Sequence, residues 1–175
     1  MNLADSQLAA KKIRLLVLDV DGVLTDGSIY YSNSGDELKA FNIQDGLGIK
    51  LLQGAGIEVA IITGRSSNLL SRRTNELGIS QVIQGREDKL TALEELLTAN
   101  PYELDEIAYM GDDLPDLAVI RRVGLGMTVA NASATVAEHA RWQSSRDGGR
   151  GAVREAAEFI LKAQDKFAAA IEPFL

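Results

Sequence analysis

Asp19 and Asp21 are separated by one residue in the stretch LLVLDVDGVLTDG (15–27), directly after an apolar run. In an extended segment, residues at this spacing project to the same side, so the two carboxylates repel each other. A divalent cation would relieve the repulsion, and so would phosphate chemistry organised around that cation. The pair therefore predicts a metal-assisted site that acts on a phosphate group.

Three segments that carry polar groups are expected to meet at this site. Asp19 and Asp21 follow one apolar segment, Thr63 and Arg65 follow EVAII (58–62), and the acidic stretch GDDLPD begins after IAYM (107–110). Short segments that are rich in branched apolar side chains are typical of strands buried in a parallel sheet. Ligands of open parallel sheets bind just beyond the carboxyl ends of the strands, where the strand order switches.

The elements that must position these residues alternate along the chain. Strands are expected at 13–18, 58–63 and 107–110, and less clearly at 82–83 and 123–129. Helical patterns cover 47–53, 68–76, 88–98, 114–121 and 152 to about 170. This alternation predicts βαβ units with right-handed crossovers, which build an α/β fold: a three-layer α/β sandwich around a Rossmann-like parallel sheet. We find no linker or repeat, so one domain spanning residues 1–175 is expected.

One segment interrupts the alternation. SIYYSNSGDELKAF (28–41) has apolar residues on both sides of an Asn-Ser-Gly-Asp turn, which indicates a β-hairpin. It lies between the first strand and the first helix, where it can project over the end of the sheet. We call it the flap. It is too short to form a cap domain.

The residue types suit phosphoryl transfer through a covalent intermediate. Asp19 can act as the nucleophile, and Asp21 can protonate the leaving group and then activate water. Mg²⁺ would take side-chain oxygens from Asp19 and Asp112 and the backbone carbonyl of Asp21. Thr63 and Lys89 can hold the phosphoryl oxygens.

Simpler interpretations exist for each group. Asp19 and Asp21 could cap a helix, and Thr63 could do the same while still binding phosphate. Lys89, early in a helix, could be a solvated side chain. Asp113 could orient Lys89 or a metal-bound water, and Asp116 could favour the start of a helix.

Composition limits the classes of function. The formal net charge is −7, which disfavours nucleic acid as a partner. The absence of cysteine excludes disulfides, thiolate nucleophiles and Cys-ligated metal sites. We expect no membrane span and no signal peptide, because the apolar runs are short and the first residues lack an apolar core. A cytoplasmic location is therefore expected.

The motifs resemble those of the haloacid dehalogenase superfamily: DVDGVLTDG its first motif, IITGR its second, Lys89 its third and GDDLPD its fourth. Within it, GSIYYSNSGDELKAFNIQDGLGIKLL and RDGGRGAVREAAEFIL are similar to the flap and the C-terminal segment of 3-deoxy-D-manno-octulosonate 8-phosphate phosphatases. The resemblance covers roughly residues 13–161. It assigns the roles given above to Asp19, Asp21, Thr63, Lys89 and Asp112.

The resemblance implies a Mg²⁺-dependent phosphatase that acts on this eight-carbon sugar acid phosphate, in the pathway to the lipopolysaccharide inner core. It also implies a homotetramer in which neighbouring subunits complete the active site through the flap and the C-terminal helix and tail (about 152–175). Substrate contacts would come from Asp21, Asn42, Ile43, Gln44, Asp45, Gly46, Arg65, Arg73 and Lys89. Helical periodicity alone slightly favours Arg72 over Arg73, and the resemblance favours Arg73.

Two alternatives differ in substrate or in class. A phosphatase of the same subfamily could act on a nine-carbon sugar acid 9-phosphate, and the residues alone do not settle this choice. A non-enzymatic phospho-receiver also combines acidic residues, Thr and Lys on an α/β sheet. Receivers place the acidic pair first and the phosphorylated Asp on a later strand, which differs from the order found here.

Overall fold

The computed structural model describes residues 2–175 and forms a six-stranded parallel sheet in the order β5-β4-β1-β6-β7-β8. The strands are β1 Leu15–Leu18, β4 Glu58–Ile62, β5 Gln81–Ile83, β6 Ile107–Gly111, β7 Leu125–Thr128 and β8 Trp142–Gln143. β1 pairs with both β4 and β6. The strand order therefore switches at β1, and ligands bind at such a point in open α/β sheets.

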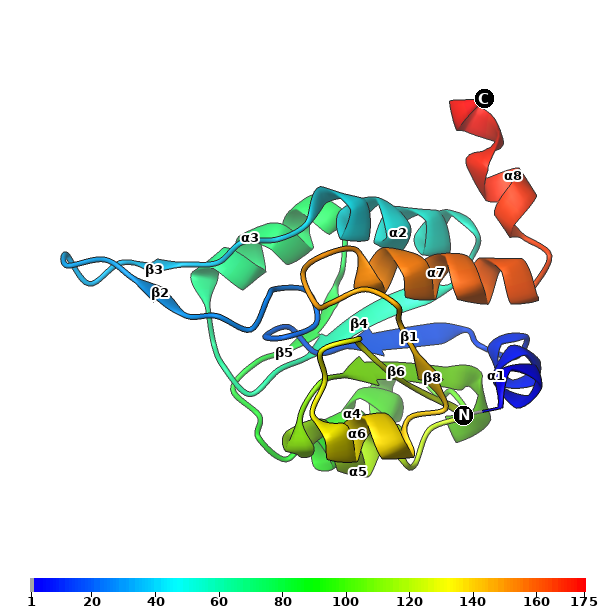
Figure 1. Ribbon diagram of the computed structural model, residues 1–175, viewed down its shortest axis with the longest axis horizontal. Helices are drawn as coiled ribbons and strands as arrows, with labels where there is room; N and C mark the ends of the chain where they lie inside the picture. The colour runs from blue at the N-terminus through cyan, green and yellow to red at the C-terminus, as the bar shows by residue number, and fades with distance from the viewer. Residues whose placement is uncertain (1) are drawn as a thin grey trace.

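Helices cover both faces of this sheet (Figure 1). On one face lie α2 (Ile43–Gly54), α3 (Asn68–Leu77) and α7 (Ala152–Ala163), which also contacts α1 (Leu3–Ala10). On the other lie α4 (Lys89–Ala99), α5 (Leu117–Ile120) and α6 (Ala134–His139).

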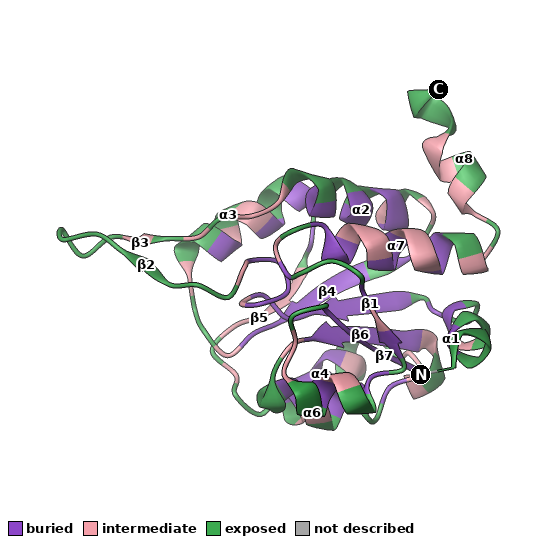
Figure 2. Ribbon diagram, viewed as in Figure 1, coloured by how far each residue is buried: buried purple, intermediate pink, exposed green. Residues whose placement is uncertain are grey.

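The core consists of two layers because side chains of a strand alternate between its faces. Leu16 and Leu18 of β1 belong to the core under α2 and α7, whereas Leu15 and Val17 belong to the core over α4 and α5. All four side chains are fully buried, as are most of the strand residues (Figure 2). The three-layer sandwich that the alternating pattern predicts is confirmed.

Several element boundaries differ from the sequence predictions. α2 begins at Ile43, four residues before Leu47, because the side chain of Asn42 accepts a hydrogen bond from the N–H of Gln44 (2.8 Å) and caps the helix. α1 and β8 were not predicted. Short 3-10 turns are η1 (Leu104–Glu106), η2 (Leu114–Asp116) and η3 (Glu172–Phe174).

The C-terminal region is two helices rather than the one predicted from 152 to about 170. α7 ends at Ala163, and Asp165 adopts a left-handed conformation (φ 56°) that a continuous helix excludes. The chain then turns into α8 (Phe167–Ile171), which leaves the body of the molecule (Figure 1). The side chains of Phe174 and Leu175, which lie beyond the end of α8, are exposed.

The flap forms as predicted, as an antiparallel pair of β2 (Tyr30–Tyr31) and β3 (Glu37–Leu38). It extends far from the sheet and is mostly exposed (Figure 2). Its turn is organised by Asp36, whose carboxylate accepts hydrogen bonds from Ser32 (3.1 Å) and Ser34 (2.6 Å). Across residues 2–175, none of the helices has both the length and the apolar character required to span a membrane.

Candidate active site

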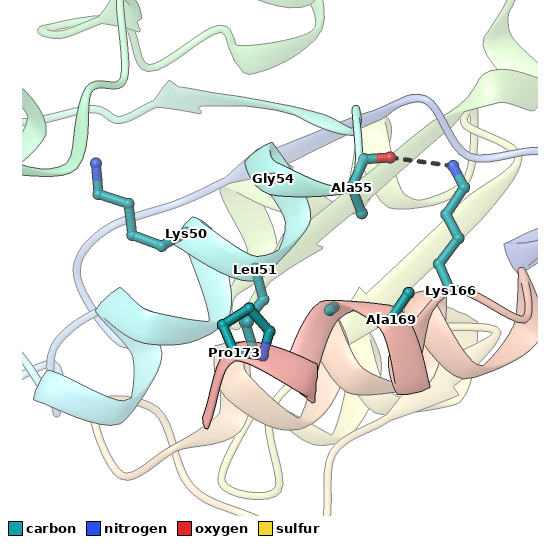
Figure 3. Close-up of a pocket in the computed structure, with 8 residues that line it drawn as sticks. Lys50, Leu51, Gly54, Ala55, Lys166, Ala169 and Pro173 are labelled. Carbon is teal, nitrogen blue, oxygen red and sulfur yellow. Dashed lines mark hydrogen bonds between the residues drawn. The ribbon is translucent and has the colours of Figure 1, made fainter. Parts of the chain in front are cut away.

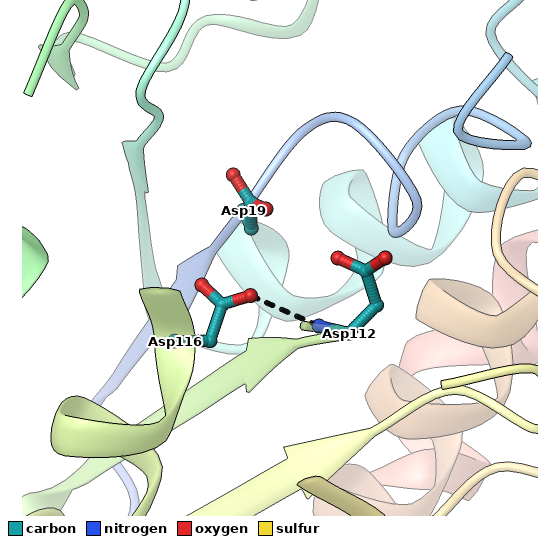
Figure 4. Close-up of side chains that lie close together, drawn as sticks. All are labelled: Asp19, Asp112 and Asp116. Carbon is teal, nitrogen blue, oxygen red and sulfur yellow. Dashed lines mark hydrogen bonds between the residues drawn. The ribbon is translucent and has the colours of Figure 1, made fainter. Parts of the chain in front are cut away.

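Asp19 and Asp112 lie side by side because they follow adjacent strands. β1 and β6 are paired as far as Leu18 and Met110, and the N–H of Asp19 continues the ladder by donating to the Met110 carbonyl (3.0 Å). Carboxylate oxygens of Asp19, Asp112 and Asp116 all lie within 4.8 Å of one another (Figure 4). The structure thus brings together carboxylates from two distant segments.

Lys89 directs its ammonium group into this acidic cluster from the first residue of α4. The carboxylate of Asp88 accepts a hydrogen bond from the Thr91 N–H (3.1 Å), which fixes the start of the helix. Lys89 Nζ lies 2.9 Å from Asp19 Oδ2 and 2.6 Å from Asp116 Oδ1, and the side chain is 5% exposed. Burial lowers the pKa of Lys89, but the charges of the two aspartates outweigh burial, and the pKa is raised.

Asp116 holds this arrangement together. Besides Lys89, its Oδ1 accepts a hydrogen bond from the hydroxyl of Tyr109 (2.5 Å), and its Oδ2 accepts from the N–H groups of Asp112 (3.1 Å) and Asp113 (3.2 Å). Four donors occupy both oxygens, so the carboxylate is committed to positioning its neighbours rather than to a metal. The sequence left the role of Asp116 open and gave no sign of Tyr109, which reads there as an ordinary core residue.

The charges of the cluster are not balanced by protein groups alone. Three carboxylates face one ammonium, which leaves two negative charges. Burial, and next the charge of Asp19, raises the pKa of Asp112 to about 7. Burial and the charge of Asp116 likewise raise the pKa of Asp19, against the opposing effect of Lys89.

These residues fit Mg²⁺. The two uncompensated charges equal those of a divalent cation, and carboxylate oxygen is the donor that Mg²⁺ prefers. The hydrogen bonds of Asp112 among residues 2–175 run through its backbone, which leaves its carboxylate for a cation. Gly22 (φ 91°) makes room for this carboxylate, because a Cβ at position 22 would overlap it. Asp19 and Asp112 are therefore the side chains that can hold the metal.

Thr63 and Arg65 line a cavity of about 610 Å³ that opens over Asp19, Asp21 and Lys89. The backbone of Thr63 is fixed at the end of β4, since its N–H donates to the Ile83 carbonyl (3.0 Å). The volume lies within the range typical of small-molecule sites. Cations, a hydroxyl and carboxylates thus share one opening of a size that suits a phosphorylated sugar.

Asp21 lies at the rim of this cavity, where the flap reaches the catalytic cluster. Its carboxylate is ion-paired with Lys39 through Oδ1 and lies 3.8 Å from Arg65 Nε through Oδ2. Arg65 also pairs with Glu37 (3.1 Å), which belongs to β3 of the flap. Sequence reasoning missed Lys39 and Glu37, because nothing in the hairpin pattern shows that their side chains turn back toward the sheet.

The residues at the start of α2 that are expected to contact substrate differ in their exposure and in their hydrogen-bond partners. Ile43 and Gln44 are exposed, and the amide of Asn42 donates to the Gly149 carbonyl (3.2 Å). Arg73 packs against Gly46 and donates to the Asn42 carbonyl (3.4 Å), and it is not among the residues that line the cavity.

The carboxylate of Asp45 connects α2 to the start of α7. Its side chain is fully buried, and its carboxylate accepts hydrogen bonds from the N–H groups of Gly151 (3.3 Å) and Arg154 (2.8 Å). A carboxylate is favoured at a helix N-terminus, where N–H groups lack partners. Asp45 therefore ties α2 to the start of α7, and a direct substrate contact by this side chain stays a prediction.

A second cavity, of about 430 Å³, lies between α2 and α8 (Figure 3). Its lining is mostly apolar, and Lys166 at its edge donates a hydrogen bond to the Ala55 carbonyl (3.2 Å). It brings together no acidic or nucleophilic groups.

Known proteins confirm the class that this site defines. The family of haloacid dehalogenase-like hydrolases matches residues 79–155, which include Lys89 and the acidic cluster that begins at Asp112. The parallel sheet has Asp19 after its first strand, Lys89 on a later helix and an acidic turn after β6. Its fold is that of this class of hydrolases.

Closer relatives narrow the class. The 3-deoxy-D-manno-octulosonate 8-phosphate phosphatase of Yersinia pestis is 51% identical over 157 residues, which are 90% of this chain and 84% of that protein. That of Escherichia coli K12 is 48% identical and covers 93% of this chain and 87% of its own length. The Moraxella catarrhalis phosphatase of the same name, solved with magnesium ion, phosphate ion and a KDO molecule, superimposes with a TM-score of 0.97 at 48% identity, over 99% of this chain and all of that one.

The chain belongs to the family of 3-deoxy-D-manno-octulosonate 8-phosphate phosphatases. This assignment confirms the superfamily and the family that the motifs indicated. It also sets aside the phospho-receiver alternative, because the relatives are phosphoric monoester hydrolases.

Proposed function

We propose that this protein is a Mg²⁺-dependent phosphatase that hydrolyses 3-deoxy-D-manno-octulosonate 8-phosphate to the free sugar acid and phosphate. The observation that carries the proposal is the contact of Lys89 with Asp19 beside Asp112 at the floor of the cavity. Relatives at 48–51% identity bear the name of this activity, and one was solved with the ion, phosphate and sugar acid.

The first step transfers the phosphoryl group to Asp19. A carboxylate oxygen of Asp19 attacks phosphorus, the bond from phosphorus to the sugar oxygen breaks, and Asp21 gives its proton to that leaving oxygen. Lys89 fixes the orientation of the nucleophile by its contact with Oδ2 (2.9 Å). The Thr63 hydroxyl and the Lys89 ammonium are placed to hold the phosphoryl oxygens.

The second step releases phosphate. Asp21 takes a proton from water, the water oxygen attacks phosphorus, and the acyl-phosphate bond breaks to restore the Asp19 carboxylate. Mg²⁺, held by the side chains of Asp19 and Asp112 and the backbone carbonyl of Asp21, supplies positive charge to a reaction that gathers negative charge. Asp116 and Tyr109 keep the supporting groups in place.

Recognition of the sugar acid falls to the rim of the cavity. Arg65 is the cation that lines the cavity beside the proton-transfer group, and a guanidinium suits a carboxylate. Asn42, Ile43, Gln44 and Gly46 at the start of α2, with Arg73 against Gly46, are proposed as further contacts.

A homotetramer is proposed for the assembled enzyme. The flap exposes Tyr31 (69%) and Leu38 (61%), and it is too small to close the cavity alone. Neighbouring subunits would complete the cover through flaps and C-terminal helices. A cytoplasmic location and a place in lipopolysaccharide inner-core biosynthesis complete the proposal. Light scattering tests the assembly, because a fully active monomer would contradict the shared cover.

The decisive assay is phosphate release across sugar acid phosphates, with and without Mg²⁺. We expect turnover of the eight-carbon 8-phosphate that depends on the metal. The second candidate substrate, a nine-carbon sugar acid 9-phosphate, uses the same chemistry, so a preference for it would overturn the substrate and leave the mechanism intact. Failure of both sugar acids with Mg²⁺ present would overturn the function.

A further inference from the structure

Lys39 is a buried cation that lies outside the motifs of the site. It directly follows β3 of the flap, yet its side chain is 4% exposed. An ammonium group loses hydration when it is buried and is tolerated only with charged or hydrogen-bonding partners. Its partners are the carboxylate of Asp21, in direct contact, and that of Glu37 at 3.9 Å.

The contact fixes one side of the group that must transfer protons. Lys39 holds Oδ1 of Asp21, while Oδ2 lies 3.8 Å from Arg65 Nε, so cations flank the carboxylate on two sides. The Asp21 side chain is 26% exposed, and without these partners it could turn into solvent. An acid or base must lie within hydrogen-bond distance of the atom it serves, so a rotated Asp21 cannot act.

The flap is the element that delivers this cation. Glu37, two residues earlier, pairs with Arg65 (3.1 Å) and thereby holds the same stretch of the flap against the rim of the cavity. The position of the flap and that of the Asp21 carboxylate are therefore linked through one short segment of chain, residues 37–39.

We propose that Lys39 is a positioning residue that holds the Asp21 carboxylate in line with the cavity, so that the flap takes part in proton transfer as well as in covering the site. The inference rests on the proposed function. It assigns to the flap a chemical role that a simple cover would lack.

Two substrates with different leaving groups distinguish a positioning role of Lys39 from a purely structural one. A sugar alkoxide leaves only with a proton from Asp21, whereas p-nitrophenolate leaves without one. The second step needs Asp21 as a base whatever the substrate. Loss of Lys39 should therefore slow both steps with the sugar phosphate but only the second step with p-nitrophenyl phosphate, so that the aryl substrate gives a burst of about one nitrophenolate per site.

The test compares Lys39→Met with Lys39→Arg and with Lys50→Met, an exposed lysine of α2. For Lys39→Met we expect kcat on the sugar phosphate to fall about 10²-fold, with the inhibition constant for inorganic phosphate within about twofold and the aryl burst present. Lys39→Arg should recover part of kcat, and Lys50→Met should match the unaltered protein. Three results for Lys39→Met would overturn the proposal. They are equal losses of kcat on both substrates without a burst, a loss of phosphate binding as large as the loss of kcat, and an unchanged kcat.

Chemical rescue keeps the test decisive if Lys39→Met folds poorly. The chain contains no cysteine, so Lys39→Cys can be alkylated with 2-bromoethylamine while unfolded and then refolded, which restores an ammonium at this one position. Lys50→Cys, treated in the same way, controls for the procedure. Restored kcat supports the proposal, and no gain over untreated Lys39→Cys contradicts it.

The proposed function and this inference fail in different ways. If the unaltered protein hydrolysed p-nitrophenyl phosphate but neither sugar acid phosphate, the substrate would be wrong. The burst comparison between the unaltered protein and Lys39→Met would still decide whether Lys39 positions Asp21.

Discussion

The acidic floor of the cavity and the flap above it both rely on paired charges, but their surroundings differ sharply. Asp116, which contacts Lys89 of the floor, is 1% exposed, and four donors occupy its two oxygens. Glu37 on the flap pairs with Arg65 where the two side chains are 29% and 42% exposed. Buried pairs are costly to break, whereas exposed pairs contribute little and are screened by salt.

This difference in burial matches a difference in the roles that we assign to the two regions. The groups to which we assign the bond-forming and bond-breaking roles are fixed by the ends of β1 and β6 and by the start of α4, all anchored in the core. Arg65 and Glu37, at the rim and on the flap, have side chains that are partly exposed. Lys39 is the exception, since it belongs to the flap but places a buried charge on the proton-transfer group.

The largest expected effect is on activity, at the floor. Asp19→Asn removes the nucleophile while leaving the size of the side chain unchanged, and we expect kcat to fall by at least about 10⁴-fold, as the loss of a nucleophile does elsewhere. Steady-state phosphate release measures this, with circular dichroism as the folding control. Activity near that of the unaltered protein would contradict the nucleophile assignment.

A smaller loss is expected when the metal ligand is displaced. Gly22→Ala places a Cβ where the Asp112 carboxylate lies, at a φ of 91°. We expect the affinity for Mg²⁺, measured by calorimetry, to fall about 10- to 100-fold. Gly35→Ala is the matched control, because Gly35 has a similar φ of 87° and open space around it. Equal effects of the two changes would show that backbone strain, rather than Asp112, is responsible.

The crowded carboxylates also predict how stability depends on pH. Between the ordinary pKa of Asp112, 3.8, and its raised value of about 7, the folded protein holds a proton that the unfolded chain has released. Stability of the metal-free protein therefore falls as pH rises through this range and levels off above it. The midpoint of thermal unfolding should be lower at pH 8 than at pH 5.5, with a smaller difference in Asp112→Asn. A midpoint that rises with pH in the unaltered protein alone would contradict the raised pKa.

The smallest expected effect concerns the flap. Glu37→Gln removes the partly exposed pair with Arg65 and the longer contact with Lys39 (3.9 Å), so the free energy of unfolding should change by less than about 1 kcal/mol. Urea titration measures it, and added salt should shrink the difference further. A loss of several kcal/mol would show that the flap is held as firmly as the floor, and the contrast between the two regions would fail.

The sequence predicts the sheet and the strand-end acids well because both depend on local patterns. Apolar runs followed by Asp or Gly mark β1, β4 and β6, and parallel pairing then brings Asp19 and Asp112 together. Features that depend on contacts between distant segments were missed. β8 is two residues long, and Tyr109 looks like any other core residue until Asp116 folds back onto it.

Asp45 and Lys39 both show that the sequence does not reveal which distant residue a side chain contacts. Asp45 lies in a motif that suggests substrate binding, but the start of α7, more than a hundred residues later, takes up its carboxylate. Lys39 lies in an exposed hairpin, but its side chain turns inward to Asp21. In both cases the partner, which the sequence does not reveal, decides the role.

Chemical trapping of the phosphorylated protein tests the central claim most directly. Protein mixed with Mg²⁺ and the sugar acid phosphate is quenched during turnover, reduced with borohydride and digested for mass spectrometry. Borohydride converts an acyl-phosphate to the alcohol, so we expect homoserine at position 19. Homoserine at another aspartate would contradict an Asp19 phosphoenzyme. So would a burst of nitrophenolate from p-nitrophenyl phosphate in Lys39→Met with no modified aspartate in the trapped protein.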